Sequence, residues 1–173
     1  IAHPLYYTQR FGDSWVNVTT LPMLLAARPL YEAGGTRLAL ALPGLGGVLT
    51  ALAAGALANR LGSRSPRPAF WVIGAASPVL VYALDLWEHT LGVAAMAWAI
   101  VALVDAVDSR RHRLMWITVG AGFGLAATMR TEALLYGAML CAVGLVRTAR
   151  RAPWSAAIGA LAALAGVACP LLL

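Results

Sequence analysis

The sequence predicts an all-α polytopic membrane protein, with about six transmembrane helices preceded by an extracytoplasmic segment. Hydrophobic residues make up 61% of the chain and charged residues only 12%, roughly half the charged share of an ordinary soluble domain. The apolar residues fall into runs long enough to cross a bilayer. The thirteen basic residues are all arginines and lie mainly between those runs. The net charge of +6 therefore indicates membrane topology, and no nucleic-acid partner is expected.

Residues 1–35 are predicted to be an extracytoplasmic loop that contains an interfacial helix. The segment is aromatic and polar at first, and it becomes partly apolar from Leu21 to Tyr31. Pro22 and Pro29 interrupt this apolar part. A short helix that lies on the bilayer fits such a mixture better than a span does.

Residues 36–173 are predicted to form a transmembrane helical domain. Six apolar runs are the expected spans: 38–57, 69–86, 90–107, 114–129, 133–146 and 154–173. Ser77-Pro78 lies near the middle of the second run, and the fifth run is short for a span of about 20 residues.

Two sets of small residues are placed for close packing between helices. Gly47, Ala51 and Gly55 form a stripe along the first span, and Gly120 and Gly124 form a GxxxG pattern in the fourth. Small side chains let helix backbones approach one another, and membrane helices use this to gain van der Waals contact.

The arginines divide the predicted loops into two classes. Every second loop is basic: Arg60, Arg64 and Arg67, then Arg110, Arg111 and Arg113, then Arg147, Arg150 and Arg151. Cytoplasmic loops of a plasma-membrane protein carry such an excess, so the intervening loops and residues 1–35 are predicted to face outside. Five of the seven acids then lie on the outer face: Asp13, Glu32, Asp85, Glu88 and Glu132. The other two, Asp105 and Asp108, are interpreted as charge partners of Arg110–Arg113.

The stretch Asp85–Thr90 is an acidic and aromatic break between two apolar runs. Asp85, Glu88 and His89 stand at i, i+3 and i+4, so a helical continuation would place them on one face. Such a set can hold a divalent metal (Mg, Mn or Zn), because carboxylates suit hard cations and imidazole accepts Mn or Zn. One carboxylate can instead act as a general base. The alternative is a polar turn between two spans, with Trp87 as an interfacial anchor.

Arg130 and Glu132 form a second candidate site on the outer face. Residues two apart do not share a helix face, so the two need not pair with each other. An arginine can hold a phosphate through two parallel hydrogen bonds. The alternative is charge balance, or a snorkelling arginine, at a tight outer turn.

Four stretches taken together resemble a known family. They are residues 21–35, residues 37–62, residues 76–90 with the acidic Glu88, and Gly122–Tyr136, which looks like the family's G-x-G-L-A-x-x-x-R-x-E stretch. The group is the membrane-embedded GT-C glycosyltransferases, which includes protein mannosyltransferases and lipid A aminoarabinose transferases. The resemblance covers most of the chain through loose motifs and spacing.

The resemblance implies an integral membrane glycosyltransferase that takes a sugar from a polyprenyl-phosphate carrier and transfers it on the extracytoplasmic face. It implies catalytic roles for Glu88 and Asp85, and substrate binding by Arg130, Glu132 and His89. Its other expected partners are membrane lipids. The family's first span and the start of its first outer loop have no counterpart in the sequence. We therefore expect a fragment that is inactive alone, with the main catalytic acid upstream of residue 1.

A non-enzymatic polytopic protein, either a transporter or a lipid-handling protein, is the alternative. A transporter predicts ionisable groups near the membrane midplane and internal repeats. In this sequence the acids instead cluster at the ends of the predicted spans, which favours the enzyme.

Overall fold

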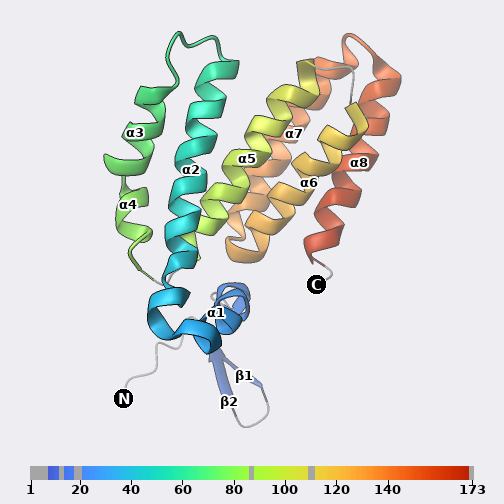
Figure 1. The fold of residues 1–173 in the computed structure, drawn as a ribbon. Coiled ribbons are helices and arrows are strands. Elements are labelled where there is room, and N and C mark those ends of the chain that lie inside the picture. Colours follow the sequence, from blue (N-terminus) through green and yellow to red (C-terminus); the bar gives the residue numbers. More distant parts are fainter. Residues whose placement is uncertain (1–7, 12–13, 18–20, 86–87, 109–111, 172–173) are drawn as a thin grey trace.

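Helices make up most of the chain in the computed structural model, which describes residues 8–11, 14–17, 21–85, 88–108 and 112–171. Within these residues a β-hairpin is followed by eight helices (Figure 1). The hairpin consists of β1 (Thr8–Phe11) and β2 (Ser14–Asn17). The helices are α1 (Leu21–Ala39), α2 (Ala41–Arg60), α3 (Arg67–Ala75), α4 (Pro78–Tyr82), α5 (His89–Asp108), α6 (His112–Met129), α7 (Glu132–Ala149) and α8 (Pro153–Leu171).

Helices α2, α5, α6, α7 and α8 run side by side as a bundle, and α3 and α4 lie along α2 (Figure 1). Helix α6 packs against both α5 and α8, and α7 contacts all three. The largest buried cluster belongs to these helices. It contains Trp116, Val119 and Phe123 from α6, Leu103 and Ala106 from α5, and Ala163 from α8.

Three helices, α2, α5 and α7, are long and apolar enough to cross a membrane. Helices α6 and α8 contain shorter apolar stretches, Leu114–Met129 and Pro153–Ala168. The predicted helical fold is thus confirmed for the described residues. The three candidate spans are consistent with a membrane protein. Six spans remain a prediction.

The predicted second span, 69–86, is not one continuous helix. Pro78 has no backbone N–H and would clash with the carbonyl one turn earlier in an unbroken helix. Helix α3 therefore ends at Ala75, and Ser77 begins the next helix by accepting a hydrogen bond from the N–H of Val79 at 3.2 Å. The fifth run differs in the opposite direction, because α7 extends beyond 133–146 to 18 residues.

Residues of both predicted sets, Gly47 and Ala51 in the first and Gly120 in the second, lie at close helix contacts. A Cβ on Gly47 would come within 2.8 Å of the Cβ of Ala83, and Ala51 faces Gly74 of α3. The stripe on α2 therefore packs against the α3–α4 segment. A Cβ on Gly120 would overlap the backbone of Ala163, so α6 and α8 approach as closely as glycine allows.

Helices α2 and α5 are joined by polar contacts at three levels. Near their first residues, the Thr90 hydroxyl donates to the carbonyl oxygen of Pro43 at 2.9 Å. Midway, the Trp98 indole N–H donates to the carbonyl oxygen of Leu49 at 3.1 Å. Near their last residues, the Arg60 guanidinium donates two hydrogen bonds to the Asp105 carboxylate, at 2.6 and 2.8 Å.

Asp105 and Asp108 have charge partners that the sequence did not suggest, while their predicted pairing with Arg110–Arg113 stays a prediction. Asp105 pairs with Arg60, and Asp108 lies 3.8 Å from Arg151. These arginines come from other loops, because the helix packing brings several helix ends together. The predicted partners Arg110 and Arg111 lie outside the described residues.

The strands β1 and β2 and helix α1 lie beyond the end of the bundle that is opposite to Arg60 and Asp105 (Figure 1). Strands β1 and β2 pair antiparallel, with Phe11 opposite Ser14. Helix α1 buries Met23 and Ala27, and it is interrupted at Gly34 and Gly35, the latter with φ of 66°. A helix in this segment is thus confirmed, whereas its position on a bilayer remains a prediction.

Candidate functional site

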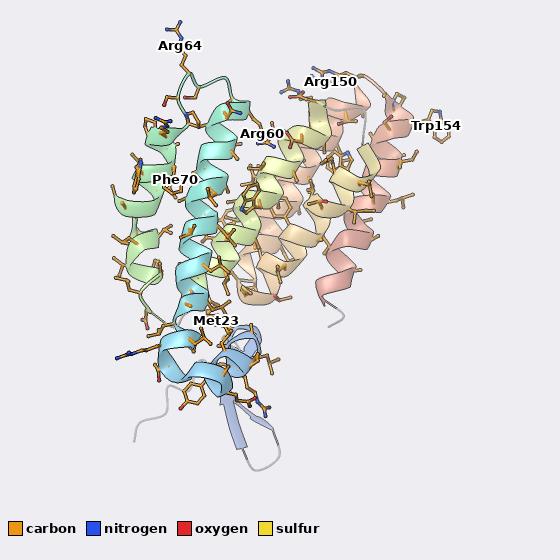
Figure 2. All side chains as sticks on the ribbon, viewed as in Figure 1. Met23, Arg60, Arg64, Phe70, Arg150 and Trp154 are labelled. Carbon is orange, nitrogen blue, oxygen red and sulfur yellow. The ribbon has the colours of Figure 1, made fainter. Side chains whose placement is uncertain are left out.

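The two candidate sites that are predicted for the outer face lie at the same end of the bundle. Helix α5 begins there, and α6 ends and α7 begins there (Figure 1). Figure 2 shows Arg60, Arg64 and Arg150 at the other end, while Met23 of α1 lies at the end with the candidate sites. The described helices therefore separate an arginine-rich end from an end that holds Glu88 and Glu132, as the alternation of loops predicts.

Glu88 is the most deeply buried acidic group that the structure describes. It precedes α5 and is only 5% exposed, and its carbonyl accepts the N–H of Gly92 at 2.9 Å. One carboxylate oxygen, Oε1, lies 3.7 Å from Nδ1 of His89. The other, Oε2, is buried without a hydrogen-bond partner among the described residues. Burying a carboxylate oxygen in this way costs free energy, so such groups are candidates for a functional role.

His89 is the first residue of α5, and its side chain contacts Tyr82, the last residue of α4. Its ring lies 4.9 Å from the ring of Tyr82, centroid to centroid, at an interplanar angle of 52°. The imidazole is thus placed between a phenol and the buried carboxylate of Glu88. In this position it can orient that carboxylate.

Asp85 is separated from this pair. Helix α5 begins only at His89, and Asp85 is exposed in a bend after α4, so the helical continuation that would place it on a common face with Glu88 is absent. Leu86 and Trp87 lie outside the described residues, so the predicted anchoring role of Trp87 does too. The described residues contain no group of three His, Cys, Asp or Glu side chains that could hold a metal ion. The predicted metal set Asp85, Glu88 and His89 does not fit this geometry, and we derive no chemical step through a metal.

Arg130 and Glu132 pair across the turn between α6 and α7. Arg130 directly follows α6, its N–H donates to the carbonyl of Ala126 at 2.8 Å, and α7 begins at Glu132. A guanidinium nitrogen lies 3.6 Å from Oε1 of Glu132. The i, i+2 spacing disfavours an ion pair inside one helix. Here the chain turns between α6 and α7, and this turn lets the two side chains approach each other. Glu132 also lies within electrostatic reach of His89.

A cavity of about 260 Å³ lies beside Arg130, between α5 and α7. Apolar residues form most of its walls, and the charged pair lies at one side. The lining residues are Gly92, Val93, Met96, Arg130, Glu132, Ala133 and Tyr136.

Gly92 connects the two candidate sites. It lies one helical turn after Glu88 and is hydrogen-bonded to it, and a Cβ on Gly92 would be 3.6 Å from Cγ of Arg130. The structure thus brings Glu88, His89, Arg130 and Glu132 to one region and leaves Asp85 at its exposed edge.

The sequence did not single out Gly92 or Tyr136. Each stands four residues after a candidate acid, Gly92 after Glu88 and Tyr136 after Glu132, so each follows that acid by about one turn. This spacing is the signal that could have found them.

This region contains the buried Glu88 carboxylate, which is not among the lining residues of the cavity, and the Arg130 guanidinium, whose residue does line it. A carboxylate with an unpaired oxygen can accept a proton, and a guanidinium can stabilise a phosphate. Comparisons with protein-family models, with curated proteins and with solved structures give no match. The function is therefore inferred from the site itself.

Proposed function

We propose that the protein is an integral membrane glycosyltransferase that transfers a sugar from a polyprenyl-phosphate donor to an acceptor at the extracytoplasmic face. The observation that carries this proposal is the buried Glu88 carboxylate, which lies one turn from the glycine that contacts Arg130. A base and a phosphate-binding cation at one end of an apolar helix bundle are the two groups that such a transfer requires.

Each residue has a defined part in the proposed reaction. Glu88 accepts the proton of the acceptor hydroxyl while the acceptor oxygen forms a bond to the anomeric carbon. The bond from that carbon to the phosphate oxygen breaks, and polyprenyl phosphate leaves with its electron pair. Arg130 stabilises the negative charge of this leaving group.

The other predicted residues act around these two groups. His89 orients the Glu88 carboxylate, and Glu132 holds the Arg130 guanidinium at the cavity. Asp85, exposed after α4, would be the second carboxylate, approaching from the solvent side. Carboxylates at the rim also favour the approach of an uncharged acceptor over an anionic one.

A non-enzymatic lipid-handling protein is the second candidate function. The observation that favours it is an apolar cavity of about 380 Å³ between α7 and α8, with Phe123 of α6 at its base. Such a cavity suits a hydrocarbon chain and contains no charged lining residue. A glycosyltransferase and a lipid-handling protein differ in whether the sugar–phosphate bond is broken.

The experiment that tests the enzyme uses the full-length protein in nanodiscs with a panel of polyprenyl-phosphate sugars. We expect release of polyprenyl phosphate, and we expect Glu88→Gln to slow it by about 10²–10⁴-fold, the usual contribution of a general base. Glu32→Gln is the matched control, because Glu32 is an exposed glutamate of α1 that pairs with Arg28. Folded protein that releases nothing from any donor would favour the lipid-handling function instead.

A second variant tests the cation. Arg130→Ala is expected to slow release by about 10²-fold, because an arginine that stabilises transition-state charge is lost. Arg28→Ala, which removes an exposed arginine from α1, is the control and should retain the normal rate. Normal turnover by Arg130→Ala would contradict the proposed role of Arg130 and would favour the alternative, in which it only balances charge at a turn.

A further inference from the structure

Gly92 of α5 lies beside the side chain of Arg130, the predicted phosphate-binding residue. Gly92 is buried in the first turns of α5. A Cβ at this position would lie 3.4 Å from Cβ of Met129, and 3.6 and 3.9 Å from Cγ and Cδ of Arg130. The methylene groups of Arg130 therefore occupy the space beside the glycine, where a side chain would otherwise lie.

The far end of the same side chain is also held. Glu132 lies 3.6 Å from the Arg130 guanidinium, so the side chain is fixed at its stem by α5 and at its head by α7. Gly92 and Glu132 both line the cavity of about 260 Å³ beside it. Moving the stem would therefore move the guanidinium relative to this cavity.

Glycine inside a helix requires a packing reason, because it stabilises a helix less than alanine does. At Gly92 the side chains of Met129 and Arg130 leave room for no more than a methyl group. An alanine methyl would meet ordinary van der Waals distances there, whereas the branched side chain of valine would need the space that Cγ and Cδ of Arg130 occupy.

We infer that Gly92 is a positioning residue that holds the Arg130 guanidinium at the cavity between α5 and α7, where it receives an anionic phosphate group. The identity of the anion in this inference rests on the proposed function. The placement of Arg130 by Gly92 does not depend on that function and can be tested without a ligand. Gly92 itself touches no reacting atom, and its effect on ligand affinity passes through Arg130.

The first test measures the placement of Arg130 without any ligand. The full-length protein in nanodiscs is treated with phenylglyoxal, and modification of Arg130 is quantified by peptide mass spectrometry. Gly92→Val is expected to change the rate about threefold or more, since it displaces a half-exposed guanidinium from α5. Gly44→Val is the matched control, because the nearest atom to a Cβ on Gly44 is 3.9 Å away and is not charged. An unchanged rate in folded Gly92→Val overturns the inference.

The second test is a double-mutant cycle on the binding of polyprenyl phosphate. Gly92→Val should weaken binding about tenfold in the native background and less than about twofold in an Arg130→Ala background, since coupled residues are not additive. Equal losses in both backgrounds would show that Gly92 acts through general packing, and this would overturn the inference.

Two further outcomes keep the inference distinct from the proposed function. If no variant and no native protein binds polyprenyl phosphate, but Gly92→Val changes the modification of Arg130, the positioning role stands and the proposed function fails. If thermal unfolding shows that Gly92→Val does not fold, Gly92→Ser replaces it, because its γ oxygen extends beyond the methyl that fits beside Arg130. A smaller change in the same direction then supports the role, and an unchanged modification rate contradicts it.

Discussion

At the scale of single residues, Glu88 stands out because it is buried at a cost. Its Oε2 atom has no hydrogen-bond partner among the described residues, and the His89 nitrogen is 3.7 Å from Oε1, beyond ordinary hydrogen-bond distance. A residue kept only for stability would not be placed this way, because removing an unsatisfied buried polar group often stabilises a protein.

This leads to a prediction that separates function from stability. Glu88→Met has nearly the same shape without the carboxylate, and it is expected to raise the free energy of unfolding by about 1 kcal/mol while it abolishes transfer. Thermal unfolding in nanodiscs measures the first effect, with Glu32→Met as an exposed control expected to change little. A large loss of stability in Glu88→Met would instead identify Glu88 as a structural residue.

The sequence predicted at which end of the bundle the candidate residues lie, but it did not predict which of them lie close together. Glu88, His89, Arg130 and Glu132 were predicted to lie on one face of the membrane, and they do lie at one end of the bundle. The predicted grouping of Asp85 with Glu88 required a helix that includes Asp85, but α5 begins four residues later, at His89. Sequence spacing does not fix that start, so the helical face expected for Asp85, Glu88 and His89 is absent, and their binding of a metal stays a prediction.

At the scale of secondary-structure elements, apolar runs bounded by arginines predicted the long helices to within a few residues. The errors have local causes. Ser77-Pro78 indicated a break in the helix, but the apolar run around it is long enough for one span and was therefore predicted as a single helix. Gly12-Asp13 separates two short segments and is typical of a two-residue hairpin connection, yet the aromatic composition of residues 1–20 concealed the strands.

The close crossing of α2 and α5 gives a prediction at this scale. A Cβ on Gly46 would lie 2.8 Å from backbone atoms of Thr90 and Leu91, which cannot move away as a side chain can. Gly46→Ala is therefore expected to destabilise the protein by about 1–3 kcal/mol through overpacking. At Gly44, two residues earlier, a Cβ would meet only the Ala83 carbonyl oxygen, at an ordinary contact distance of 3.9 Å, so Gly44→Ala should be neutral or slightly stabilising. Unfolding curves of the two variants test this, and equal stability would contradict the crossing.

At the scale of the whole molecule, the helices divide the charges between two ends, and this division was predicted from the arginines alone. Which end faces outside remains a prediction. The positive-inside rule assigns the end with Arg60, Arg64 and Arg150 to the cytoplasm. Composition can predict such an orientation because it depends on counts of residues in loops, whereas the site depends on individual contacts.

Labelling of single cysteines tests the orientation. In a background without Cys141 and Cys169, Ser65→Cys lies in the exposed loop after α2, and Thr131→Cys lies in the exposed turn before α7. An impermeant maleimide added to intact cells should label Thr131→Cys at once and Ser65→Cys only after the membrane is opened. Labelling of both from the same side would refute the predicted topology.

The three polar contacts between α2 and α5 impose a condition on chain length. The two helices run in the same direction, and they are tied near their starts by Thr90 and Pro43 and near their ends by Arg60 and Asp105. Loss of one residue between Pro43 and Arg60 would turn Arg60 about 100° around the helix axis and shorten α2 by about 1.5 Å. The two helices can therefore gain or lose residues only together, whereas the connection between Leu61 and Pro66 is free to vary in length.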